Sequence, residues 1–156
     1  MDDLHRHAAK VGAGATLRDL RLRRLNAELL KPSGKSPFSF ELTINPSFEV
    51  DDHNVLYEID YVVEAQDADA AEMFKVNVAY TVLYEVDSDE LLDESLLGAF
   101  GDVSVLFHTY PYLRETLHTI TGRFGLPPLV LDTWKNPMDA ALRTDPHPET
   151  PPEANV

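Results

Sequence analysis

Four stretches of the chain alternate between hydrophobic and polar residues, with the period of two that is typical of strands with one buried face. They cover about residues 16–30, 38–45, 54–65 and 72–86. The last two are separated only by the short polar segment 66–71, which predicts that they form a hairpin. Because each stretch has one apolar and one polar face, we expect an antiparallel sheet with one face covered and one in water.

Two of these stretches contain irregularities. In the first, the hydrophobic alternation slips by one position after Leu22, and an extra residue near Arg23 or Arg24 would restore it. This predicts a β-bulge there. The second stretch is followed by Pro46, which has no N–H to donate, so we expect the strand to end or kink at that proline.

A helical pattern follows the fourth stretch. Asp87 or Ser88 can cap a helix with an acidic first turn and leucines at helical spacing. Gly101 is expected to interrupt it, Pro111 to kink it or start a new segment, and Gly125 to end it. The order of four strands and then helices, with the helices on one face of the sheet, predicts an α+β fold.

The domain is expected to cover residues 16–143, with a short last helix over about 132–143. Residues 1–15 are rich in alanine and glycine, and residues 144–156 combine proline with acidic side chains. Both ends offer little to bury, so we predict a disordered N-terminus and a disordered acidic tail.

Composition restricts the compartment and the partners. The chain has 156 residues, no cysteine and a net charge of −14. Residues 1–35 carry eight Lys or Arg and four Asp or Glu, whereas the remainder carries five and 23. An acidic body disfavours nucleic acid as the main partner. The N-terminus lacks the apolar core of a signal peptide and no apolar stretch is long enough to span a membrane, which predicts a cytoplasmic protein that does not insert into membranes.

Candidate chemistry is sparse. His5 and His7 have no third ligand at a metal-binding spacing, and Glu115 with His118 forms an ordinary helical pair without a nucleophile. Neither a GxGxxG nor a GxxxxGK[ST] loop occurs. We therefore assign no catalytic residue, metal site or cofactor, and predict that the protein is not an enzyme.

The most specific pattern lies between residues 97 and 129. It consists of LGAF at 97–100, VLF at 105–107, YPYLRE at 110–115 and FGLPPL at 124–129. This pattern resembles the SecB family of protein-export chaperones, in which a long helix containing a PYxRE element leads to a loop with glycine and proline. The resemblance implies a four-stranded antiparallel sheet with Greek-key connections and helices on one side. It also implies a homotetramer built as a dimer of dimers.

The function implied by this resemblance is that of an ATP-independent holdase for unfolded polypeptides, which can deliver preproteins to the Sec translocase. The family's client groove lies between the loop after the long helix, the last helix and the sheet. Trp134 is the strongest candidate because it is large and lies among polar neighbours, although sealing of the core explains each candidate equally well. The candidates are Leu126, Leu129, Val130, Leu131, Trp134, Tyr57 and Phe74.

A second family surface is the acidic outer face of the sheet, which docks the motor ATPase SecA. The corresponding acids here are Glu28, Glu41, Glu58 and Asp60. The match is partial, because Arg24 stands where an acid is expected and Asn77 where the fourth strand usually has Glu. An alternative is therefore a SecB-like chaperone dedicated to an antitoxin. More distant alternatives are a hotdog-like thioesterase or dehydratase and an oligomeric adaptor.

Overall fold

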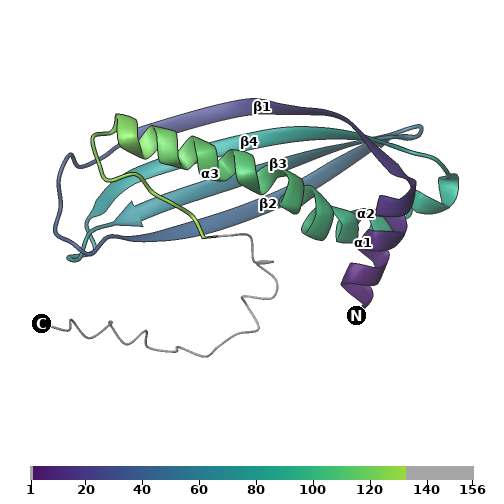
Figure 1. The fold of residues 1–156 in the computed structure, drawn as a ribbon, viewed down its shortest axis with the longest axis horizontal. Coiled ribbons are helices and arrows are strands. Elements are labelled where there is room, and N and C mark those ends of the chain that lie inside the picture. Colours follow the sequence, from purple (N-terminus) through teal and green to yellow (C-terminus); the bar gives the residue numbers. More distant parts are fainter. Residues whose placement is uncertain (1, 133–156) are drawn as a thin grey trace, which may run out of the picture.

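Four strands form one antiparallel sheet in the order β1-β4-β3-β2 (Figure 1). The computed structural model describes residues 2–132. The strands are β1 (Ala15–Leu29), β2 (Ser39–Asp51), β3 (Asn54–Gln66) and β4 (Glu72–Val86). Because β2, β3 and β4 follow one another while β1 returns beside β4, the connections are those of a Greek key, as expected. Segment 66–71 forms the predicted connection between β3 and β4.

The helix α1 (Asp3–Gly14) precedes the strands at the N-terminus, and α3 (Leu106–Arg123) lies across one face of the sheet (Figure 1). Between β4 and α3 the chain forms the 3-10 turn η1 (Asp89–Leu91), the helix α2 (Glu94–Phe100) and the π-helical turn η2 (Gly101–Val105). The predicted α+β architecture, with helices after the four strands, is confirmed. The expected short helix over about 132–143 lies outside the described residues, apart from its first position.

Alternation in β3 and β4 determines which face is buried. Every second residue of β3 from Val55 to Ala65 is buried, and the partners of these residues in β4 run from Tyr84 to Phe74. These side chains pack beneath α2 and α3 and form the core. The central strands therefore have the one-sided burial that their sequence predicts.

The edge strand β1 contains two irregularities. Its register with β4 shifts between Leu17 and Asp19 and again between Leu22 and Arg24. The second shift confirms the predicted β-bulge and makes Arg23 the extra residue. The first shift, at Arg18, was not predicted. Together the two bulges keep the apolar side chains of β1 on the same face as those of β4 over the 15-residue strand.

The second strand was expected to end or kink at Pro46, and an end there is wrong. β2 runs to Asp51, and Pro46 pairs with Ile59 in unbroken register. The reason is the position of β2 at the edge of the sheet, where a strand has one row of backbone groups without a partner strand. A proline is tolerated there because its missing N–H removes no bond from the ladder.

The N-terminal segment, expected to be disordered, is the helix α1 (Figure 1). Asp2 caps it by accepting a hydrogen bond from the His5 N–H at 2.9 Å. Ala8 and Val11 are buried, and α1 packs against α2. Docking of one small apolar face therefore orders a segment whose composition alone suggests disorder.

The helical region after β4 differs in detail from the prediction, which had the helix begin at Asp87 or Ser88. Ser88 precedes η1 without a side-chain cap, and Asp93 caps α2 by accepting from the Leu96 N–H at 3.1 Å. The predicted interruption at Gly101 is confirmed by the π-helical turn. Pro111, in contrast, lies inside α3 without starting a new helix.

Gly125 ends α3, as predicted. Its φ of 77° lies in the left-handed region, which glycine adopts without steric cost. The Gly125 N–H donates to the Gly122 carbonyl and the Leu126 N–H to the Thr121 carbonyl, the two bonds of a Schellman motif. The chain then turns back across the helix-covered face of the sheet (Figure 1). None of the helices in residues 2–132 has the length and apolar character needed to cross a membrane.

Candidate functional site

An apolar groove of about 280 Å³ lies where β2 and β4 begin and β3 ends. The segment after α3 closes it on one side, and the start of β2 forms the other side. Its apolar lining residues are Phe38, Phe40, Ala65, Met73, Phe74, Leu126, Pro127, Pro128, Leu129 and Val130, with Ser39 and Thr121 as polar members. The arrangement offers hydrophobic contact on several sides and few fixed polar partners.

The lip of the groove presents large side chains to solvent. Val130 is 64% exposed and Phe40 45% exposed, and Phe38 is exposed to a similar degree. The floor, in contrast, is fixed: Phe74 is buried and its ring lies 5.6 Å from that of Phe124. Exposed apolar surface of this kind is stabilised by contact with an apolar partner rather than with solvent.

A buried carboxylate supports the wall nearest β2. The Asp67 side chain is fully buried and accepts from the Lys31 ammonium at 3.0 Å and from the backbone N–H groups of Asp69 and Ala71. The Lys31 hydrogen bond, followed by the backbone donors, lowers the pKa of Asp67 from 3.8 to about 2. Lys31 belongs to the connection between β1 and β2, and Asp67 to the turn between β3 and β4. The ion pair therefore links these two connections. The β1–β2 connection continues to Phe38, which lines the groove.

The structure brings together four of the seven residues expected to form the groove. Phe74, Leu126, Leu129 and Val130 all line it. Leu131 is buried in the core beside it. Trp134 lies outside the described residues.

Tyr57 does not belong to the groove, and its assignment there was wrong. Its side chain is buried beneath α2, where its hydroxyl donates to the Leu97 carbonyl at 2.7 Å. Burial raises its pKa above the usual range of a tyrosine. Gly101 permits this packing, because a Cβ there would lie 3.0 Å from the Tyr57 ring.

Sequence reasoning missed Phe38, Phe40 and Met73. The first two begin the second alternating stretch, and their exposure follows from the position of β2 at the edge of the sheet. The apolar side chains of an alternating strand are expected to be exposed when that strand lies at the edge of the sheet. The sequence alone does not show which strand lies at the edge.

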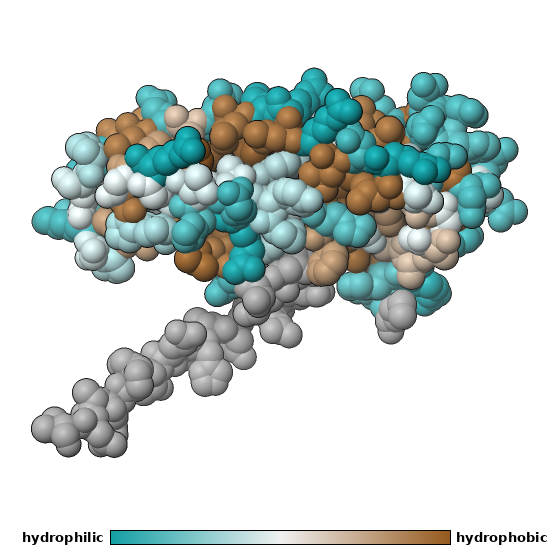
Figure 2. Space-filling model, turned by 45° about the horizontal axis from the view of Figure 1, so that its top comes forward, coloured by the Kyte–Doolittle hydropathy of each residue, from teal (hydrophilic) through white to brown (hydrophobic). Residues whose placement is uncertain are grey.

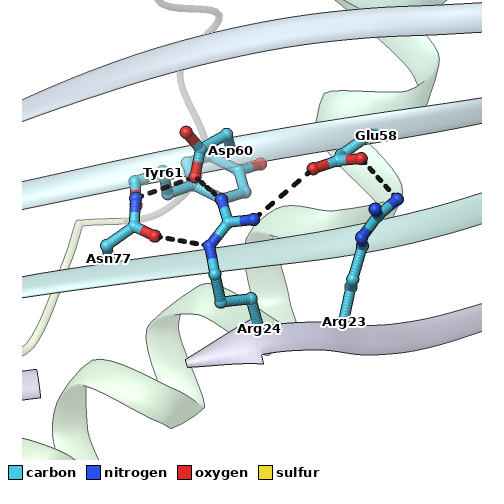
Figure 3. A network of polar contacts seen from close by, with 6 residues as sticks. All are labelled: Arg23, Arg24, Glu58, Asp60, Tyr61 and Asn77. Atoms are coloured by element: carbon cyan, nitrogen blue, oxygen red, sulfur yellow. Dashed lines mark hydrogen bonds and ion pairs between the residues drawn. The ribbon is translucent and has the colours of Figure 1, made fainter. Parts of the chain in front are cut away.

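The outer face of the sheet is held together by ion pairs rather than being uniformly acidic (Figure 3). Arg24 donates to Asp60 at 3.1 Å and to Asn77 at 3.0 Å, while Asn77 donates to Asp60 at 2.8 Å. Arg23 pairs with Glu58 at 2.8 Å. The two positions that depart from the family pattern, Arg24 and Asn77, are therefore partners in one network.

The other acids of this face have different neighbours. Glu28 stands opposite Lys75 in the register of β1 and β4, and Glu41 stands opposite Glu64 in that of β2 and β3. Of the four acids expected to dock SecA, Glu58 and Asp60 are thus neutralised by arginines. A basic partner would find less free negative charge on this face than four carboxylates suggest.

A second apolar region lies along β1 and the exposed side of α3. Leu17, Leu22 and Leu25 point to the helix side of the sheet yet remain exposed, and Phe107 of α3 is 57% exposed. Several separate hydrophobic patches are visible between hydrophilic residues in Figure 2. Leu17 and Phe107 also border a cleft of about 440 Å³, at whose wall the Tyr84 hydroxyl and His108 Nδ1 are hydrogen-bonded.

Within residues 2–132 no group of three or more His, Asp or Glu side chains is arranged to hold a metal ion. Burial lowers the pKa of His108, which favours its neutral form. The prominent features of the described surface are apolar grooves and patches.

No protein-family model matches the chain. It is similar to two proteins of Mycobacterium tuberculosis, both named SecB-like chaperones: MT2006 of strain CDC 1551 (Oshkosh), 28% identical, and Rv1957 of strain H37Rv, 27% identical. Each alignment covers 87% of this chain and 86% of the relative. Among solved structures, it is similar to Rv1957 in complex with a ChAD peptide from the Rv1956 HigA1 antitoxin. The TM-score is 0.74 and the identity 27%, over 85% of this chain and 99% of the other.

Proposed function

We propose that this chain, a SecB-like protein in sequence and in fold, is an ATP-independent chaperone that binds an extended polypeptide segment in its apolar groove. The observation that carries the proposal is the groove itself, with its rigid floor at Phe74 and its exposed lip at Phe40 and Val130. Its relatives carry the name of chaperones, which supports a binding function rather than catalysis.

The size of the groove suggests how clients bind. Burial of one large apolar side chain contributes about 1.5–3 kcal/mol. A complex with micromolar affinity needs about 8 kcal/mol after the costs of association and ordering are met. A groove of about 280 Å³ accommodates one or two large side chains. Useful affinity therefore requires a client with several apolar residues that also contact the lip, which is a property of unfolded segments.

Between the two roles considered for a SecB-like protein, we favour an antitoxin segment as the client over general delivery to the Sec translocase. The relative of known structure is bound to an antitoxin peptide. The ion pairs of Glu58 and Asp60 on the outer face add a second reason, because they leave less free acidic surface for a motor such as SecA. General holding of unfolded proteins is the second candidate, and the same groove supports it.

Self-association would bury apolar side chains that the single chain leaves exposed. A second copy that packs against β1 and the exposed side of α3 would cover Leu17, Leu22, Leu25 and Phe107, which the single chain leaves in water. This fits a dimer or the dimer of dimers that the family resemblance implies. Light scattering coupled to size-exclusion chromatography tests it. A monomer at micromolar concentration would contradict it.

Holding is tested by diluting a chemically unfolded protein from guanidinium chloride into buffer with this protein and no nucleotide, while light scattering is recorded. The parent should suppress aggregation at stoichiometric amounts. A double variant Phe40→Ser and Val130→Ser should lose most of this effect. Leu56→Ser is the matched control, because Leu56 is similarly exposed but lies outside the groove. Aggregation that the parent does not suppress would argue against holding.

The client class is tested separately with a fluorescently labelled ChAD peptide of the Rv1956 HigA1 antitoxin, the peptide bound in the structure of the relative. Tight binding of this peptide that a tenfold excess of a generic unfolded protein does not displace would support an antitoxin-directed role. Ready displacement would favour the general holdase. A Trp134→Ala variant that binds the peptide as well as the parent would remove Trp134 from the groove.

A further inference from the structure

The segment Leu126–Leu129 forms one wall of the groove and has an unusual hydrogen-bonding pattern. Pro127 and Pro128 carry no backbone N–H, so the four residues offer only two such donors. The Leu126 N–H donates to the Thr121 backbone carbonyl at 3.2 Å, and the Leu129 N–H donates to the Thr121 hydroxyl at 2.8 Å. Both donors of the wall therefore end on one residue of α3.

The Thr121 hydroxyl is oriented before it meets the wall. It is 1% exposed, and it donates to the Leu117 carbonyl at 2.7 Å and more weakly to that of His118 at 3.3 Å. A hydroxyl has one proton to donate and two lone pairs to accept with. Since the proton is directed into the helix, only acceptor capacity faces Leu129.

Loss of this hydroxyl would have a local consequence. The Leu129 N–H would lose its partner in a half-buried position, which costs free energy unless the segment moves to reach water. Two successive prolines make the segment stiff, so it would move as a unit rather than bend at one residue. Pro127, Pro128 and Val130 would then change their distance from Phe40 and Phe74 across the groove.

We propose that Thr121 is a positioning residue that holds the Leu126–Leu129 wall in place and thereby sets the affinity of the groove for its client. The proposal rests on the proposed function, because it assumes that a polypeptide occupies the groove. Thr121 acts through the wall, and its own hydroxyl is already used by Leu117 and Leu129.

The test compares three variants of the full chain. Thr121→Val keeps the shape of the side chain and removes the hydroxyl, and Thr121→Ser restores it. Thr109→Val is the matched control. Thr109 is also buried in α3 and also bonds a helix carbonyl, but its other partner is the Tyr61 hydroxyl in the core, away from the groove.

Two quantities are measured: the dissociation constant of the fluorescent ChAD peptide and the hydrogen exchange of the Leu129 amide in the free protein. Thr121→Val should weaken binding about tenfold and speed Leu129 exchange, as expected when a half-buried hydrogen bond is lost. Thr121→Ser should restore both. Thr109→Val should lower stability yet leave both quantities at the parent's values.

The possible failures differ from one another. A Thr121→Val protein that binds the peptide as tightly as the parent, or keeps Leu129 exchange slow, overturns the role of Thr121. Equal weakening by Thr109→Val also overturns it, because the effect would then be one of general stability. If the parent binds neither the peptide nor an unfolded protein, the proposed function falls instead.

Discussion

The helix α1 provides the sharpest test of the fold, because its order depends on docking. Val11 is fully buried in the core, next to α2. Val11→Ala removes two methyl groups, worth roughly 1.6 kcal/mol at about 0.8 kcal/mol each, and leaves a small cavity. Alanine is the better helix former by about 0.6 kcal/mol, which opposes the loss. The net destabilisation expected is about 1–3 kcal/mol.

The sign of the effect separates a docked helix from an undocked one. If α1 did not pack on α2, Val11→Ala would be neutral or slightly stabilising, since only helix propensity would change. Urea unfolding followed by circular dichroism measures the difference, at equal chain concentration for parent and variant because oligomers unfold in a concentration-dependent way. Lys10→Ala, on the exposed side of α1, is the control and should change stability little. A Val11→Ala midpoint equal to or above that of the parent would refute the docking argument.

Three further predictions concern the sheet and its connections. The pKa of Asp67 is lowered to about 2 in the folded protein, so its contribution to stability is present above about pH 4 and is lost as the pH falls towards 2. The Asp67→Asn variant should therefore be less stable than the parent at pH 7 and should lose less stability on acidification. Urea titrations at several pH values measure both differences. Tyr57→Phe removes the bond to the Leu97 carbonyl and should cost about 1 kcal/mol in thermal unfolding, with peptide affinity unchanged. Arg24→Ala should cost less than about 1 kcal/mol and less still in high salt, because Arg24 and Asp60 are both partly exposed; a larger loss would mean that the outer network is a major source of stability.

The sheet could be predicted from sequence because each of its strands has a clear alternation. A shift of one residue would turn every apolar side chain of β3 towards solvent, so pattern alone determines its facing. The same logic located the bulge at Arg23. It failed at Pro46 because the consequence of a proline depends on whether its strand is central or at an edge, and strand order is a property of the whole fold.

The groove was only partly predictable. Phe74, Leu126, Leu129 and Val130 could be assigned because the family resemblance places the groove between the sheet and the loop after the long helix. The Tyr57 side chain lies on the same face of the sheet as Phe74, but it is covered by α2. The alternation of a strand shows which face a side chain lies on, and does not show which helix covers it. The role of Thr121 could not be seen at all, since a threonine in a helix becomes informative only when the returning chain meets it. The N-cap at Asp2 was a signal for α1 that the Ala- and Gly-rich composition concealed.

Pro46 has a consequence for how the protein behaves at high concentration. An unpaired strand edge is a template on which further strands, including those of other copies, can add and grow into aggregates. β2 spans Ser39–Asp51, and Pro46 near its middle removes one donor from that edge. Glu41, Glu49 and Asp51 add negative charge along the same strand. The proline and the acidic side chains of β2 therefore oppose the pairing of further strands, from this chain or from other copies, at the edge of the sheet.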